Sequence, residues 1–130
     1  MTDTERTAGG DADIELEVPL RSERAKTVRV VAASLAADAG FTIDDIDDLR
    51  LAISEIFSIL IDDSTGARAR IRFSVGDGEI RASIEQVGAD DAIELDELAS
   101  NILATVVDEF AVDGPAVRLV KRADSGTVAD

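Results

Sequence analysis

The segment from Asp47 to Asp63, DDLRLAISEIFSILIDD, is the most apolar long stretch of the chain and limits most strongly what it can fold into. Its apolar side chains recur at the i, i+3, i+4, i+7 spacing that places them on one face of a helix. They are Leu49, Ala52, Ile53, Ile56, Ile59 and Leu60. We therefore predict a central core helix. Glu55 lies at the edge of its apolar face, so it is either a partly exposed helix residue or one group of a functional site.

The start of this helix is marked by Thr42, a residue type that caps helix N-termini. Four aspartates follow in the first turns, where the helix dipole favours negative charge. They are Asp44, Asp45, Asp47 and Asp48. Because the dipole accounts for this acidic run and EF-hand spacing is absent, we predict no metal site there.

Two further helices and four strands are predicted around the central helix. Ile14–Leu20 alternates as a half-buried strand, with Pro19 indicating a sheet edge. A helix capped by Ser22 runs to Ala39 and stops at Gly40. The remaining elements are a strand over Arg68–Val75, a turn at Gly76–Gly78, a strand over Glu79–Gln86, a loop over Val87–Glu94, a helix over Leu95–Phe110, a turn at Asp113–Pro115 and a strand over Ala116–Arg122.

The predicted order is β-α-α-β-β-α-β. Antiparallel strands with helices on one face make a two-layer α+β sandwich, and 130 residues suit one domain. We expect that domain to cover residues 13–123, between disordered polar tails at residues 1–12 and 124–130.

Composition excludes several classes of chemistry. The chain has no Cys and no His, which rules out disulfides, thiol nucleophiles, imidazole catalysis and Cys/His metal sites. The net charge of −15 argues against a nucleic-acid binder or a protein of anionic membrane surfaces. No apolar run approaches the roughly 20 residues that span a bilayer, and the acidic N-terminus is unlike a signal peptide. We expect a soluble cytoplasmic protein.

A cluster of basic residues lies at the start of the first predicted helix. Its positive charge is opposite to the net charge of the chain, and it is unfavourable beside the positive end of the helix dipole. It consists of Arg21, Arg24, Lys26 and Arg29. Two interpretations stay open: solvated surface charge, or a patch that meets a partner or an anion.

The element order, the run LRLAISEIFSILID and the closing strand AVRLVKR resemble the RsbW-type anti-sigma factors. These are small members of the histidine-kinase-like (GHKL) ATPase superfamily. The resemblance spans Ile14 to Arg122 and implies the histidine-kinase-like ATPase fold, an ATP pocket and a homodimer. It also implies two partners, a sigma factor and an anti-anti-sigma protein of the STAS type.

The residues that the resemblance assigns to nucleotide binding depart from the family pattern. Glu55 matches the family's general base on the central helix, but Ile59 stands where an Asn one turn later holds Mg²⁺, and an apolar side chain cannot ligate that cation. In the Asp-x-Gly-x-Gly motif that binds adenine, Gln86 replaces the Asp, Gly88 is kept and Asp90 replaces the last Gly. An amide such as Gln86 can still hydrogen-bond a purine edge.

The family's third feature, a glycine-rich turn that cradles phosphates, is absent between Gly88 and Gly114. Carboxylates fill that segment instead. We therefore predict a catalytic position at Glu55, cofactor-binding positions at Gln86 and Gly88, and no bound cofactor, with ATP and Mg²⁺ only if the site is retained.

Three functions follow. The first is an anti-sigma factor that binds and sequesters an RNA polymerase sigma factor, which an anti-anti-sigma protein causes it to release. The second is an ATP-dependent serine kinase that phosphorylates that anti-anti-sigma partner, with Glu55 as base. The third is a pseudo-ATPase scaffold for another protein.

Overall fold

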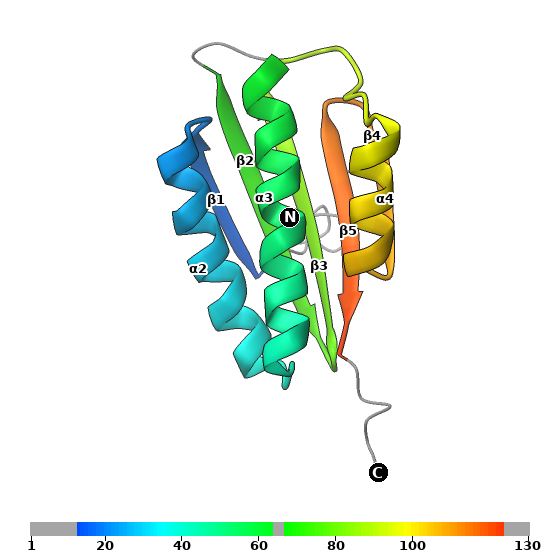
Figure 1. Cartoon of the computed structure of the whole chain (residues 1–130). Helices are drawn as coiled ribbons and strands as arrows, with labels where there is room; N and C mark the ends of the chain where they lie inside the picture. Colours follow the sequence, from blue (N-terminus) through cyan, green and yellow to red (C-terminus); the bar gives the residue numbers. More distant parts are fainter. Residues whose placement is uncertain (1–12, 64–66, 124–130) are drawn as a thin grey trace, which may run out of the picture.

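The computed structural model describes residues 13–63 and 67–123 as two packed layers (Figure 1). The predicted tails at residues 1–12 and 124–130 lie outside the described residues. The elements in chain order are β1 Ile14–Pro19, α2 Ser22–Asp38, α3 Ile43–Asp63, β2 Arg68–Gly76, β3 Glu79–Val87, α4 Glu97–Val106, β4 Glu109–Asp113 and β5 Ala116–Arg122.

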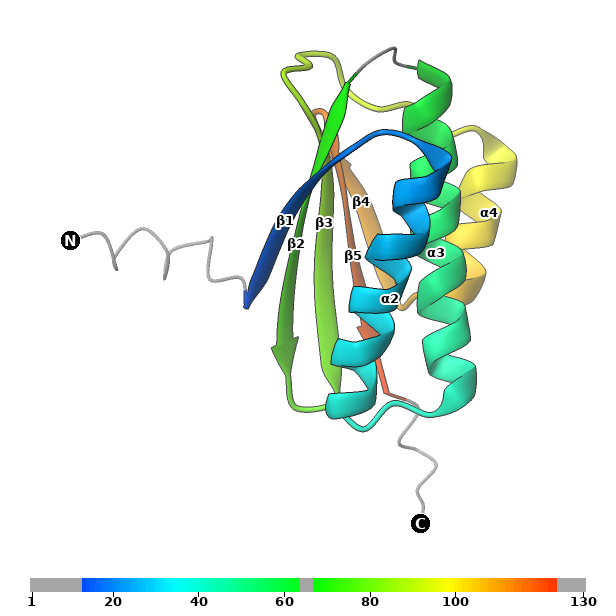
Figure 2. The same cartoon turned by 90° about the vertical axis from the view of Figure 1, so that its left-hand side faces the viewer.

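The described strands form one antiparallel sheet in the order β1-β2-β3-β5-β4. All three described helices cover the same face of it (Figure 2). The predicted α+β sandwich is confirmed, and β1, which contains Pro19, lies at an edge as predicted. No helix among the described residues has the length and hydropathy needed to span a membrane.

The prediction for the third helix was wrong at its C-terminal end. It placed the end at Phe110, but α4 stops at Val106 and Val107 is already extended. Residues Glu109–Asp113 instead form β4, where Phe110 pairs with Leu119 of β5. In this segment, the backbone forms hydrogen bonds with the neighbouring strand β5 instead of continuing the helix. The contact with β5 therefore decides the structure here, although the spacing of the apolar residues is helical.

The cap predicted at Ser22 was also wrong. Arg21 is the N-cap residue of α2, without a side-chain capping hydrogen bond, and Ser22 is the first helical residue. The Arg21 N–H donates to the Pro19 carbonyl over 2.9 Å and closes a tight turn after β1. The helix therefore begins one residue earlier than predicted.

The junction between α2 and α3 has the predicted signals. Gly40 adopts φ of 87°, and the Phe41 N–H donates to the Ala36 carbonyl over 3.0 Å, which closes a Schellman motif. Thr42 Oγ1 accepts from the Asp45 N–H over 3.1 Å, while Asp45 Oδ2 accepts from the Thr42 N–H over 3.3 Å. This reciprocal capping fixes the start of α3.

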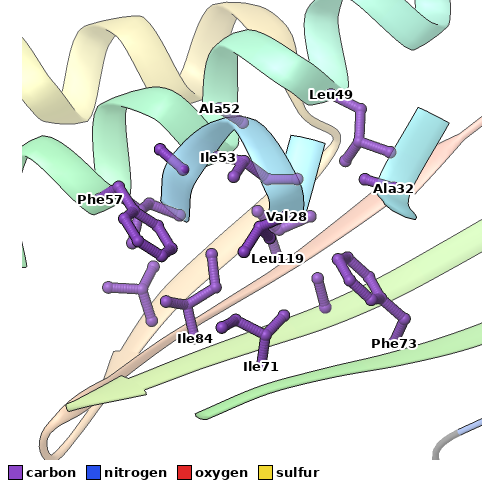
Figure 3. Close-up of a cluster of buried hydrophobic side chains, with 14 of the residues drawn as sticks. Val28, Ala32, Leu49, Ala52, Ile53, Phe57, Ile71, Phe73, Ile84 and Leu119 are labelled. Carbon is purple, nitrogen blue, oxygen red and sulfur yellow. The ribbon is translucent and has the colours of Figure 1, made fainter. Parts of the chain in front are cut away.

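The core lies between the three described helices and the sheet, and each of these helices contributes fully buried side chains. Figure 3 shows Ile53 and Phe57 of α3 facing Ile71 and Ile84 of the strands. Most of the predicted apolar face of α3 is fully buried, together with Phe57, which the spacing did not include. Ile59 is only half-buried. The central helix is therefore a core helix, and the edge of its apolar face that carries Ile59 is less buried than the rest of that face.

The face of the sheet opposite the helices carries cross-strand ion pairs. Arg68 Nε lies 2.8 Å from Glu17 Oε2, and Arg72 Nε lies 3.1 Å from Glu15 Oε1. The hydrogen bond from Arg68 holds the pKa of Glu17 below its ordinary value of 4.5, and the charges of Arg68 and Arg70 add to this effect. The arginines of β2 share this face, and their charge is matched there by carboxylates.

Candidate functional site

A cleft of about 670 Å³ opens beside the C-terminal part of α3. Its wall combines Ile59 of α3, Gln86 near the end of β3, and residues 89–96, which connect β3 to α4. Figure 1 shows this connection passing the C-terminal end of α3 on its way to α4. The cleft therefore lies beside Ile59 and Gln86, two of the positions that the resemblance relates to nucleotide binding.

Gln86 is held by the sheet and by the β4–β5 turn. It pairs with Ala69 of β2, and its N–H donates to the Pro115 carbonyl over 2.8 Å. Its side chain is half-buried and lines the cleft without a described hydrogen bond to another side chain. The amide is thus free to donate to or accept from a ligand.

Gly88 turns the chain out of β3 with φ of 83°, a conformation that favours glycine. A Cβ at this position would meet nothing within 4 Å, so the glycine serves the backbone conformation rather than a close approach between protein atoms. The turn is followed by the Ile93 N–H donating to the Gly114 carbonyl over 3.0 Å, which ties the connection to the sheet. Gly88 itself does not line the cleft.

Glu55 and Ile59 lie one helical turn apart on α3, but only Ile59 lines the cleft. Glu55 is half-buried and makes no hydrogen bond or ion pair with the described residues. Of the predicted positions, the structure therefore brings together Ile59, Gln86 and Asp90, and it leaves Glu55 and Gly88 outside the lining.

Four acidic residues give the cleft its charge, and its described lining contains no lysine or arginine. They are Asp90, Asp91, Glu94 and Asp96. The last of these caps α4, since Asp96 Oδ1 accepts from the Ala99 N–H over 2.8 Å. Negative charge on this scale disfavours a triphosphate. No cluster of three or more potential metal ligands occurs within the described ranges.

The basic cluster of α2 is exposed over most of its length. Arg24 donates to Thr27 over 3.2 Å, and Arg29 donates to Ser54 of α3 over 3.1 Å. Arg21 and Lys26 are exposed. None of these four cations has an ion-pair partner in the described part of the chain, so their charge is available to another molecule.

Sequence reasoning missed a buried ionic contact between β5 and α3. Lys121 is 8% exposed, and its Nζ lies 3.4 Å from Asp48 Oδ2 and 3.9 Å from Asp45 Oδ1. The alternation of Val117, Leu119 and Lys121 along β5 is the signal that could have placed this lysine on the inward face. The contact secures the N-terminal turns of α3 to the sheet.

No family model matches the chain. The serine-protein kinase RsbW of Bacillus velezensis is 27% identical over 88 residues, covering 65% of this chain and 54% of that protein. The serine-protein kinase RsbW of Halalkalibacterium halodurans is 37% identical over 49 residues, covering 38% of this chain and 30% of that protein. The chain thus spans about half or less of the length of these relatives.

The fold is also found in a solved structure. The crystal structure of the RsbU and RsbW domains of Rv1364c from Mycobacterium tuberculosis matches 85% of this chain and 32% of that chain, with a TM-score of 0.62 and 20% identity. At this identity the match shows a shared fold. Together with the sequence similarities, it confirms the predicted resemblance to RsbW-type proteins.

Proposed function

We propose that this chain, which resembles the RsbW-type proteins in sequence and fold, is an anti-sigma factor. In this role it binds and sequesters an RNA polymerase sigma factor in the cytoplasm, and an anti-anti-sigma protein of the STAS type releases it. The observation that carries the binding role over a catalytic one is Ile59 in the cleft wall. An apolar side chain at this position cannot hold Mg²⁺, whereas sequestration requires only a complementary surface.

The charge of the chain supports such a partner. Sigma factors bind DNA and carry basic surfaces, so a protein with a net charge of −15 is electrostatically complementary to them. The basic cluster at the start of α2, which forms no ion pair with the described residues, is our candidate for a second recognition patch, because its sign is opposite to the net charge of the chain. We further propose that the chain acts as a homodimer, as the resemblance implies.

A pull-down from the native cytoplasm tests this proposal. We expect the tagged chain to recover a sigma factor, and the purified pair to bind equally with and without Mg²⁺-ATP. A bait with Arg21→Gln, Arg24→Gln and Lys26→Gln should retain less sigma factor, while the exposed Arg50→Gln variant should retain the wild-type amount. Recovery of unrelated proteins alone would contradict the anti-sigma role and favour the scaffold.

The serine kinase is the second candidate, favoured by the similarity to two serine-protein kinases and by a cleft that is open rather than filled. Here Glu55 would be the base, and Gln86 and Gly88 would border the adenine.

For the wild-type chain we expect no heat in calorimetry with millimolar Mg²⁺-ATP and no thermal shift. The Ile59→Asn variant is the matched comparison, since it supplies the missing amide ligand. Magnesium-dependent ATP binding by the wild type, followed by phosphate transfer to a serine of the anti-anti-sigma partner, would establish the kinase instead.

A further inference from the structure

We infer that the cleft beside Ile59 and Gln86 is a docking groove for a basic segment of a protein partner, a short stretch of chain that carries arginine or lysine. The inference rests on the proposed function, because it assumes that the chain works by binding a protein. It adds a surface and a partner chemistry that the resemblance does not supply.

The dimensions of the cleft suit more than one side chain. A volume of about 670 Å³ falls within the range of roughly 300–1,000 Å³ that is usual for ligand pockets. Its lining mixes the apolar side chains of Ile59 and Leu95 with the amide of Gln86 and with carboxylates. A groove of this size and lining can take a few consecutive residues of a partner.

The charge of the cleft distinguishes it from a second, neutralised groove on the sheet. Asp90, Asp91 and Glu94 are exposed, and none of them has an ion-pair partner among the described residues. A concave surface lined with charge of one sign concentrates the electrostatic potential and attracts cations.

The contrasting surface is a groove of about 530 Å³ on the uncovered face of the sheet. Its arginines are Arg72, Arg81 and Arg118, and each lies in an ion pair with a carboxylate, at 3.1, 2.7 and 3.7 Å. The arginines of that groove are neutralised by carboxylates of the same chain. The carboxylates Asp90, Asp91 and Glu94 of the cleft beside Ile59 are not neutralised by the described residues, so they can pair with cations of a partner.

Arginine and lysine side chains fit this combination of groups. Their long aliphatic stems pack on apolar side chains such as Ile59 and Leu95 while the charged ends reach carboxylates. A guanidinium also donates to carboxylates in pairs and to the oxygen of an amide such as Gln86. A bare metal ion fits less well, because the described residues do not gather three ligands around one point.

The test compares two variants with the same change in net charge. The cleft variant carries Asp90→Asn, Asp91→Asn and Glu94→Gln. The control variant carries Glu23→Gln, Asp38→Asn and Asp77→Asn, all exposed and outside the cleft lining. Binding of a short fluorescein-labelled arginine–leucine peptide is measured by fluorescence anisotropy near physiological salt, and thermal unfolding by circular dichroism checks that both variants fold.

We expect the cleft variant to weaken peptide binding on the order of tenfold and the control by less than about threefold, because local charge pairs contribute more than net charge at this salt concentration. Equal weakening by both variants would overturn the inference, as would complete displacement of the peptide by Mg²⁺ at constant ionic strength.

The same two variants are then assayed with the purified sigma factor. If the wild type binds the sigma factor and the cleft variant binds it equally well, the docking inference fails while the proposed function stands. If the cleft variant alone loses the basic peptide but no chain binds the sigma factor, the docking inference stands and the proposed function fails.

Discussion

Replacing Phe57 by alanine is expected to lower the free energy of unfolding by about 3–5 kcal/mol. The side chain is 1% exposed and packs between α3 and the sheet (Figure 3). Its removal forfeits the burial of a whole aromatic ring and leaves a cavity that the surrounding side chains fill only in part. Urea unfolding followed by circular dichroism at 222 nm measures the loss, with the slope of the transition expected to stay unchanged.

Leu51→Ala is the matched control, since Leu51 lies on the same helix with 48% of its surface exposed. We expect this substitution to change the unfolding free energy by less than about 1 kcal/mol. A small effect of Phe57→Ala, comparable to that of Leu51→Ala, would show that α3 does not bury this face against the sheet.

The same helix shows how far hydrophobic spacing can predict a core. Phe57 and Ile59 lie at opposite margins of the apolar face of α3, because each residue advances the helix by about 100°. Spacing alone included Ile59 and omitted Phe57. In the structure the roles are the opposite: Phe57 is fully buried in the core, and Ile59 borders the open cleft. Which margin meets the core depends on what packs beside the helix, and that information lies elsewhere in the chain.

The end of α4 illustrates a second limit. Leu103, Val106 and Phe110 continue a helical spacing, and the run is too short to exclude a strand by periodicity. Pairing of Phe110 with Leu119 decides the outcome through a partner strand that follows in the sequence. By contrast, the strands of the β2–β3 hairpin were predictable, because alternation and a Gly-Asp-Gly turn are local signals.

The candidate site was predictable only in part. The proximity of Ile59 and Gln86 came from the resemblance, because no spacing rule joins a helix residue to a strand residue far along the chain. The structure adds that the acidic connection to α4 forms the rest of the wall. Unpaired charge in that wall could not be recognised beforehand, since pairing depends on which cations the fold brings near.

Lys121→Met is expected to destabilise the fold by about 3 kcal/mol, although it keeps an aliphatic side chain of similar reach. Asp45 is 4% exposed, and its buried carboxylate would lose this cation while keeping its other contacts, among them the hydrogen bond from the Thr42 N–H. Removing one partner of a buried pair costs more than the pair contributes, because the remaining charge keeps its desolvation penalty. We expect a loss of stability at the lower end of the range for buried ion pairs, because the side chain of Asp48, the nearer carboxylate, is 43% exposed and partly solvated. Urea unfolding at neutral pH measures the change.

Two further variants separate the charge from the packing. Arg118→Met removes a cation from the same strand where the side chain is 62% exposed, and it should cost less than about 1 kcal/mol. Adding Asp45→Asn to Lys121→Met removes the buried carboxylate charge that had faced Lys121 while keeping an oxygen that can accept from the Thr42 N–H, so part of the loss should be recovered. If Lys121→Met and Arg118→Met cost the same, or if Asp45→Asn deepens the loss, the contact between β5 and α3 does not depend on buried charge. The N-terminal turns of α3 would then be held by other contacts, among them the Thr42 cap and apolar packing.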